Sequence, residues 1–449
     1  MIPLTSLETW IAHKISGDRE PPPLTRAALR RYQLEKLQGL IAYVREYSPF
    51  YRRRLNGLSG QALTQLEDLE TFPFTTSRDL RAETLQFLCI SCGSVERIVS
   101  LPPGSIGEAP KRLHFTREDL EQTIDFFHYG LSTWVGPDDR VLILMPGEKP
   151  DSVGDLLRRG LQRLKVRSVI HGPVMDPVQT VEVIRKNRMN CLVGIPTQVL
   201  ALARCLPDED RLKDRISKIL LCSDYVSGAL VDVLERTWRC TVFSHYGLTE
   251  TGYIGGVECH ACQGYHLCEA DLYLEIIDPL TGQVQPAGES GEIVVTTLNR
   301  TGMPLIRYRT GDVTRIIPEK CPCGSILKRL DRVSHSLDRV VFLCPGTLLT
   351  MSQLDETLFS LPGVFDFQAE ITRGDDRDLL KIILYLAEGA DSSQIIDRAR
   401  ERLQAVPSIE TAVKGGRLVV ETISSHTGYR PFAGGLKRVI ADHRPSSPG

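Results

Sequence analysis

Residues 140–196 read RVLILMPGEKPDSVGDLLRRGLQRLKVRSVIHGPVMDPVQTVEVIRKNRMNCLVGIP and alternate between short apolar runs and amphipathic stretches. The runs RVLILMP, RSVIH and NCLVGIP have the length of buried strands, whereas DLLRRGLQRL and DPVQTVEVIRKNR between them are typical of helices. The alternation continues through RISKILLCS, LVDVLERTWR and CTVFSHYG as far as residue 247. Because strands that alternate with helices form parallel sheets with crossover helices, the sequence predicts an α/β fold.

The regions on either side of this stretch have different patterns. Residues 24–55 carry leucine, isoleucine and valine at helical spacing and predict one long helix. Thr76 or Ser77 is placed to cap a further helix that opens at Arg78. Beyond Asp271 the sequence is rich in strands separated by turn residues, which predicts an antiparallel, β-rich subdomain.

The C-terminal part of the chain has a pattern of its own. It predicts helices near residues 352–364 and 392–406 and strands near residues 381–387 and 416–423. Such an alternation of helices and strands fits a small α+β domain. We therefore predict a large N-terminal domain of mixed and parallel sheets with helices and the β-rich subdomain over residues 1–334, followed by a small α+β domain over residues 335–449.

Composition excludes several classes of protein. Of the 449 residues, 42% are hydrophobic and 24% charged, and the formal net charge is −2. There is no basic excess that would recruit nucleic acid or anionic lipid. No run approaches the roughly 18–20 apolar residues of a membrane span, and charges interrupt the N-terminal residues where a signal peptide would have its apolar core. We expect a cytoplasmic protein without nucleic-acid or membrane partners.

The first motif with a chemical meaning lies in residues 244–256, SHYGLTETGYIGG, where a strand ends in a loop. Chemistry at the α-phosphate of ATP needs a hydroxyl near that phosphate and an acidic group for the magnesium ion that neutralises its charge. Thr249 and Glu250 supply these two groups. A plain strand-to-loop turn is the alternative interpretation of this stretch.

A second motif follows in residues 308–312, YRTGD, where a strand ends in a tight Gly-Asp turn. A carboxylate at Asp312 can accept hydrogen bonds from both hydroxyls of a ribose. Gly-Asp alone is a common turn dipeptide and carries little weight. Together with the earlier motif, however, it favours a nucleotide site.

The two motifs in this order, with FPFTTSRDLR at residues 72–81 before them and IDPLTGQVQPAGESGEIVVTTL at residues 277–298 between them, resemble the phenylacetate–CoA ligase branch of the AMP-forming, adenylate-forming enzymes. The resemblance covers about residues 34–444. It implies an adenylation domain followed by a mobile C-terminal domain. It also implies activation of a carboxylic acid with ATP and Mg²⁺, and transfer of the acyl group to CoA. An aryl or arylacetic acid is suggested by the resemblance alone.

The resemblance also implies roles for individual residues. Thr249 and Glu250 would contact the α-phosphate and magnesium, and Asp312 the ribose. The implied nucleotide-binding residues are Gly104, Ser105, Gly107, Lys111, Ser223, Asp224, Tyr246, Gly247, Asp312 and Asp338. The acyl group would border Phe243, His245, Tyr246 and Pro196.

The sequence departs from the family at three places. In the phosphate loop, residues 102–111, Ile106 removes one hydroxyl donor and Glu108 adds a negative charge beside the phosphates, although the backbone N–H groups can still bind phosphates. Where the family has a catalytic lysine near the C-terminus this chain has Gly435, so we assign the role to Lys437, two residues later, and a solvated surface lysine is the alternative interpretation. The hinge shows Ser336 where the family has arginine. These departures leave open a nucleotide-binding protein that has lost turnover. A separate alternative is an adenylating enzyme with an acceptor other than CoA.

Cysteines form the second strong pattern. Cys259 and Cys262, with His266 and Cys268 nearby, are followed by Cys321 and Cys323. Thiolates and imidazole in two short loops are the ligands of a tetrahedral structural zinc. The resemblance implies that Cys259, His266, Cys321 and Cys323 are the four zinc ligands. Cys262 is the alternative to His266 as a zinc ligand, because Cys-x2-Cys is the more general spacing of zinc ligands. Reduced cysteines without metal are the alternative.

The remaining cysteines are expected to be small buried residues. Those so interpreted are Cys89, Cys92, Cys191, Cys205, Cys222, Cys240 and Cys344. For the oligomeric state we expect a homodimer, only because twofold dimers are the commonest oligomers.

Overall fold

The fold is taken from a computed structural model. The structure describes residues 2–18, 20–58, 63–102, 109–204, 212, 214–425 and 438–445. The chain divides into two compact units, which we describe separately. The first unit comprises residues 1–138, 149–167 and 243–333, and the second comprises residues 139–148, 168–242 and 334–449. The division into an adenylation domain and a C-terminal domain at residues 334/335 stays a prediction.

The helices of the first unit correct one prediction. They are α1 (Ser6–Ser16), α2 (Arg26–Tyr47), α3 (Pro49–Arg54), α4 (Ser77–Ala82), α5 (Arg117–Leu131) and α6 (Val153–Arg163). The single helix predicted over residues 24–55 is wrong, because the chain breaks at Ser48 and begins α3 at Pro49. Proline disfavours helical geometry in the residue before it, yet fits the first position of a new helix. Thr76 caps α4 through Asp79 N, as predicted.

The strands of the first unit form three antiparallel groups. β1 (Arg97–Leu101) pairs with β2 (Lys111–Phe115). A second group has the order β7 (Thr241–Gly247), β8 (Gly255–Glu258), β9 (Tyr265–Leu267), β14 (Arg329–Leu330) and β13 (Ile316–Ile317). The third has the order β10 (Leu272–Ile277), β11 (Gly291–Thr297) and β12 (Tyr308–Thr314). The antiparallel, β-rich region predicted beyond Asp271 is therefore confirmed.

The second unit contains the strand–helix alternation. Its sheet has the order β6 (Lys218–Leu221), β5 (Cys191–Gly194), β3 (Arg140–Ile143) and β4 (Arg167–Ile170). The pairs β3–β5 and β5–β6 are parallel. The helices are α7 (Pro177–Lys186), α8 (Pro196–Arg204) and α9 (Gly228–Trp238). The predicted α/β class is confirmed.

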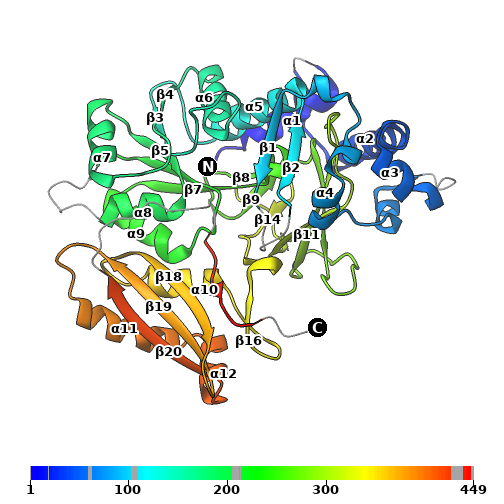
Figure 1. Ribbon diagram of the computed structural model, residues 1–449. Helices are drawn as coiled ribbons and strands as arrows, with labels where there is room; N and C mark the ends of the chain where they lie inside the picture. The colour runs from blue at the N-terminus through cyan, green and yellow to red at the C-terminus, as the bar shows by residue number, and fades with distance from the viewer. Residues whose placement is uncertain are drawn as a thin grey trace. The chain divides into compact units, whose positions relative to one another are not determined.

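The C-terminal residues of the second unit form a second sheet. Its order is β20 (Leu418–Ser425), β19 (Asp378–Leu386), β18 (Val364–Arg373) and β21 (Ala441–Asp442). The helices are α10 (Met351–Leu358), α11 (Ser392–Gln404) and α12 (Pro407–Lys414). Short strands β15 (His335–Ser336), β16 (Val341–Cys344) and β17 (Thr347–Leu349) precede them. Helix α11 packs along β20 (Figure 1). β18 and α12 were not predicted from the sequence.

One apolar core runs through the second unit. Buried leucine, isoleucine and valine side chains of α7–α9 belong to the same cluster as those of β18, β19 and α11. Trp238 of α9 and Phe367 of β18 are its large aromatic members. Among the described residues, no helix is both long and apolar enough to span a membrane.

Candidate active site and metal centre

Three buried side chains of the first unit meet around the Thr249–Thr251 turn that follows β7. Glu250 forms an ion pair with Lys111 of β2, and both side chains are about nine-tenths buried. Lys111 Nζ also donates to the Tyr308 hydroxyl at 3.0 Å. That hydroxyl donates to Glu250 Oε1 at 3.0 Å. We call these residues the Lys111–Glu250–Tyr308 cluster.

The charges of this cluster follow from its environment. Burial acts to raise the pKa of Glu250, but the ion pair with Lys111 and several hydrogen bonds outweigh it, and the pKa lies below its usual value. Burial and the neighbouring carboxylate raise the pKa of Tyr308 well above its usual value. Glu250 is therefore a carboxylate and Tyr308 a neutral donor. A hard carboxylate oxygen is the kind of ligand that suits Mg²⁺.

Arg300 donates hydrogen bonds to two backbone carbonyls beside the Lys111–Glu250–Tyr308 cluster. Its guanidinium donates to the carbonyl of Glu250 and, at 3.0 Å, to the carbonyl of His114. It lies 4.5 Å from the centre of the Phe115 ring, and Asp119 is its counter-ion at 3.7 Å. Because His114 belongs to the strand that carries Lys111, Arg300 fastens the Glu250 turn to that strand. The sequence analysis missed both Arg300 and Tyr308, whose partners are distant in sequence.

Tyr246 and Asp312 form a second contact of the same unit. The Tyr246 hydroxyl donates to Asp312 Oδ2 at 3.2 Å. The amide of Asp312 donates to Thr310 Oγ1 at 3.1 Å, which orients the Gly-Asp turn. Burial and the Asp312 carboxylate raise the pKa of Tyr246 well above its usual value. The structure thus brings together two residues that the sequence assigned to the nucleotide.

The residues expected around the acyl group do not share one face of β7. The His245 ring packs 5.6 Å from Phe126 and 6.2 Å from Phe127. Phe243 lies two residues earlier on the same strand face, because side chains alternate along a strand. Tyr246 points instead to Asp312. Burial lowers the pKa of His245 to about 4, so the ring is neutral.

The other predicted residues lie in the second unit, just after Tyr246 in the first unit, or outside the described residues. Ser223 has a positive φ of 76°, and Asp224 Oδ2 accepts from the amide of Arg438 at 3.3 Å. Pro196 opens α8, and Asp338 accepts from the hydroxyl of Ser336 at 2.8 Å. Gly247 and Thr249 follow Tyr246 in the first unit, and a Cβ at Gly247 would lie 2.4 Å from the carbonyl oxygen of Tyr253. Gly104, Ser105, Gly107 and Lys437 lie outside the described residues.

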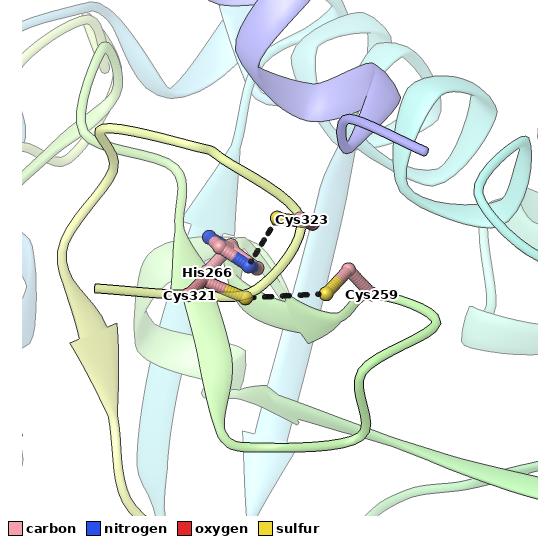
Figure 2. A group of neighbouring side chains, drawn as sticks. All are labelled: Cys259, His266, Cys321 and Cys323. Carbon is pink, nitrogen blue, oxygen red and sulfur yellow. Dashed lines mark hydrogen bonds between the residues drawn. The ribbon is translucent and has the colours of Figure 1, made fainter. Parts of the chain in front are cut away.

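Four of the five predicted zinc ligands gather in the first unit. The ligand atoms of Cys259, His266, Cys321 and Cys323 all lie within 4.8 Å of one another, and all four residues are buried. Figure 2 shows the four side chains converging from two loops and from β9. Cys262, which is half-buried, is not part of this group of described residues. Its amide donates to the Cys259 carbonyl at 2.9 Å and closes the turn.

Two distances in this group fit a tetrahedral zinc. Sγ of Cys259 lies 3.6 Å from Sγ of Cys321, and Sγ of Cys323 lies 3.5 Å from Nε2 of His266. Zinc bonds of about 2.3 Å to sulfur and about 2.0 Å to nitrogen in a tetrahedron place such atoms roughly 3.5–3.8 Å apart. Burial raises the pKa of Cys259 and lowers that of His266 to about 4, so the imidazole is neutral. A neutral imidazole is the form that binds a metal.

The other cysteines that the structure describes differ in how deeply they are buried. Cys89, Cys191, Cys222 and Cys240 are buried, as predicted. Cys92 is exposed and Cys344 half-buried, which corrects the prediction for these two. Cys92 lies in a short turn with polar neighbours, where no apolar layer covers it. Cys205 lies outside the described residues.

Comparison with known proteins gives relatives over most of the chain. The family described as AMP-binding enzyme matches residues 164–301. The phenylacetate-coenzyme A ligase of Thermus thermophilus is 29% identical over 357 residues, which are 76% of this chain and 77% of that protein. The protein of the same name from Escherichia coli K12 is 26% identical over 401 residues, 86% of this chain and 90% of that one. That from Aromatoleum evansii is 25% identical and covers 96% and 98% of the two chains.

Solved structures share the fold. A 2-hydroxyisobutyryl-CoA ligase in a postadenylation state, with 2-HIB-AMP, has a TM-score of 0.79 at 20% identity. The match covers 94% of this chain and 91% of that one. The anthranilate CoA ligase AuaEII, with anthranoyl-AMP, has a TM-score of 0.54 at 14% identity and covers 76% and 65% of the chains.

Proposed function

Because this chain belongs to the phenylacetate–CoA ligase-like branch of the AMP-binding enzymes, we propose that it is an ATP-dependent, AMP-forming acid–CoA ligase. The observation that carries the proposal is the meeting of Lys111 and Glu250 with Tyr308 of β12, the strand that also bears Asp312. A bound nucleotide requires a buried cation for its phosphates, a buried carboxylate for its metal ion and a hydrogen-bond acceptor for its ribose hydroxyls.

The reaction has two displacements. In the first, a carboxylate oxygen of the acid attacks the α-phosphorus of ATP, an acyl-adenylate forms, and pyrophosphate leaves. In the second, the thiol of CoA loses its proton and attacks the acyl carbon, and AMP leaves. Both are reactions in which the protein mainly positions groups and stabilises charge.

Each predicted residue has a place in this scheme. Thr249 would bind the α-phosphate, Asp312 the ribose hydroxyls, and Lys111 the outer phosphates. Glu250 would hold Mg²⁺, which when bound neutralises phosphate charge. Lys437 would stabilise the charge that develops on the carboxylate and the α-phosphate. Ser223 and Asp224 would lie beside the adenine.

The acid is proposed to be an arylacetic or other aryl acid. Three relatives over most of the chain are named phenylacetate-coenzyme A ligases. The aromatic surroundings of His245, which include Phe126 and Phe127, support a flat apolar acyl group.

The test is ATP–pyrophosphate exchange with a panel of aryl and short-chain acids, followed by addition of CoA. We expect acid-dependent exchange, and formation of the acyl thioester and AMP once CoA is present. Thr249→Ala and Lys437→Ala should each lower the exchange rate by roughly 10²-fold or more, because each removes a donor to developing charge. Nucleotide binding without exchange with any acid would favour a protein that has lost turnover. Exchange without thioester formation would favour another acceptor.

We also propose a structural zinc held by Cys259, His266, Cys321 and Cys323. Four protein ligands leave no open position, so the ion would join the two loops rather than act on substrate. Protein purified without chelator should contain one zinc per chain by elemental analysis. Cys323→Ser should lose the metal and lower the melting temperature, whereas Cys262→Ser should retain the metal. Metal-free wild-type protein, or equal loss in both variants, would contradict the proposed ligands.

The location and assembly of the protein stay predictions. We propose the cytoplasm and a homodimer, and light scattering of the purified chain tests the second.

A further inference from the structure

Lys111 and Glu250 neutralise each other in a buried ion pair. The proposed function assigns them to different partners, since Lys111 would bind nucleotide phosphates and Glu250 a divalent cation. Both side chains are nearly inaccessible, at 10% and 9% exposure. Water therefore screens this pair far less than a surface pair.

The ion pair places a positive charge directly on one of the two carboxylate oxygens of Glu250. Glu250 Oε1 is the atom that receives both the Lys111 ammonium and the Tyr308 hydroxyl. A divalent cation beside the same oxygen would meet the positive charge of Lys111 at close range. Repulsion between like charges in a buried site opposes that arrangement strongly. Glu250 is thus a poor cation ligand as long as Lys111 stays in place.

Other contacts hold Glu250 independently of Lys111. The Tyr308 hydroxyl donates to its carboxylate at 3.0 Å, and Arg300 donates to its backbone carbonyl. If Lys111 turned toward another anion, these two contacts would keep the carboxylate and the turn where they are. Lys111 needs no more than a change of its flexible side chain to do so.

We propose that Lys111 is an internal counter-ion that keeps divalent cations away from Glu250 until the phosphates of a nucleotide draw Lys111 to themselves. Nucleotide and cation then enter in that order or together, and a cation alone does not occupy the site. Tyr308 is a positioning residue, because it holds the carboxylate during the exchange of partners. The proposal rests on the proposed function, in that it takes the nucleotide to bind beside this cluster.

The test measures Mn²⁺ binding to the full-length protein by electron paramagnetic resonance, in which only the free ion gives the strong signal. Without nucleotide, wild-type protein should bind Mn²⁺ weakly. Lys111→Met should bind it at least about tenfold more tightly, because the competing charge is gone. Lys111→Gln provides the same test should the Met variant fail to fold.

Matched variants separate charge from other effects. Lys111→Arg keeps the positive charge, and Tyr308→Phe keeps the ion pair, so both should bind Mn²⁺ as weakly as wild type. Glu250→Gln combined with Lys111→Met should lose the gained affinity, which distinguishes this site from the cysteine cluster. In wild type, ADP or ATP should tighten Mn²⁺ binding at least about tenfold beyond the affinity of the free nucleotide.

Two outcomes would overturn the proposal. One is equal Mn²⁺ affinity of wild type and both neutral Lys111 variants without nucleotide. The other is tight Mn²⁺ binding by wild type at Glu250 when no nucleotide is present. Neither measurement depends on turnover. If Mn²⁺ binding behaves as expected but no acid supports pyrophosphate exchange, the counter-ion role stands and the ligase function fails.

Discussion

At the scale of single residues, His245 makes stability depend on pH. Burial lowers its pKa to about 4, whereas the unfolded chain has an imidazole pKa of about 6.5. Between these values the unfolded state binds more protons, so stability rises with pH and is lost as the pH falls from about 6.5 toward about 4. We expect wild type to lose about 2 kcal/mol relative to His245→Gln between about pH 7 and about pH 5. Denaturant titrations of both proteins at the two pH values provide the measurement.

The comparison with His245→Gln isolates this one group, because every other titrating residue is common to both proteins. Parallel stability profiles would mean that His245 takes up its proton in the folded state at the same pH as in the unfolded chain. Lower pyrophosphate exchange by the variant would be expected if the ring borders the acid.

At the scale of elements, two helical glycines differ in what surrounds them. A Cβ at Gly39 of α2 would have nothing within 4 Å. A Cβ at Gly160 of α6 would lie 2.9 Å from Phe127 Cβ and 3.2 Å from the amide of His128, both in α5. Gly39→Ala should stabilise the protein by about 0.5–1 kcal/mol, since alanine loses less entropy in a helix. Gly160→Ala should destabilise it by about 1–3 kcal/mol, because α5 must shift.

Each of these glycine variants serves as the control of the other. Unfolding by denaturant, followed by circular dichroism, measures both differences. The same sign for both substitutions would show that helix propensity, and not the packing of α5 against α6, decides the effect.

At the scale of the whole molecule, Arg438 ties together distant segments of the second unit. It forms an ion pair with Asp355 of α10, and its guanidinium lies 3.7 Å from Asp224 and 3.6 Å from Asp366 of β18. It also lies 4.9 Å from the centre of the Phe359 ring. Arg438→Met would leave three carboxylates without their cation, so we expect a loss of about 3–5 kcal/mol.

The exposed Arg400 is the matched control. It pairs with Asp397 on the surface of α11, with 46% and 76% of the two side chains exposed. Arg400→Met should therefore change stability by less than about 1 kcal/mol. Denaturant unfolding and protection of β18 amides from hydrogen exchange measure the two variants. Similar losses in both would contradict a special role for the buried cluster.

The sequence by itself determined the α/β class, the antiparallel region beyond Asp271 and the candidate residues Thr249, Glu250 and Asp312. These depend on local signals: the period of apolar residues, turn residues and short motifs. Two further local signals were not used in the prediction. Pro49 marks the break between α2 and α3, and Phe367, Ala369 and Ile371 of β18 alternate with polar residues.

Tertiary structure alone decided which distant side chains meet. It paired Lys111 with Glu250, 139 residues away, and brought the Tyr308 hydroxyl within hydrogen-bond distance of both. It brought His266 rather than Cys262 to Cys259, Cys321 and Cys323, and it brought the Tyr246 hydroxyl to Asp312, 66 residues away. The physical reason is that such contacts follow from strand pairing and packing between segments far apart in the chain, whereas sequence periodicity reports only the nearest few residues.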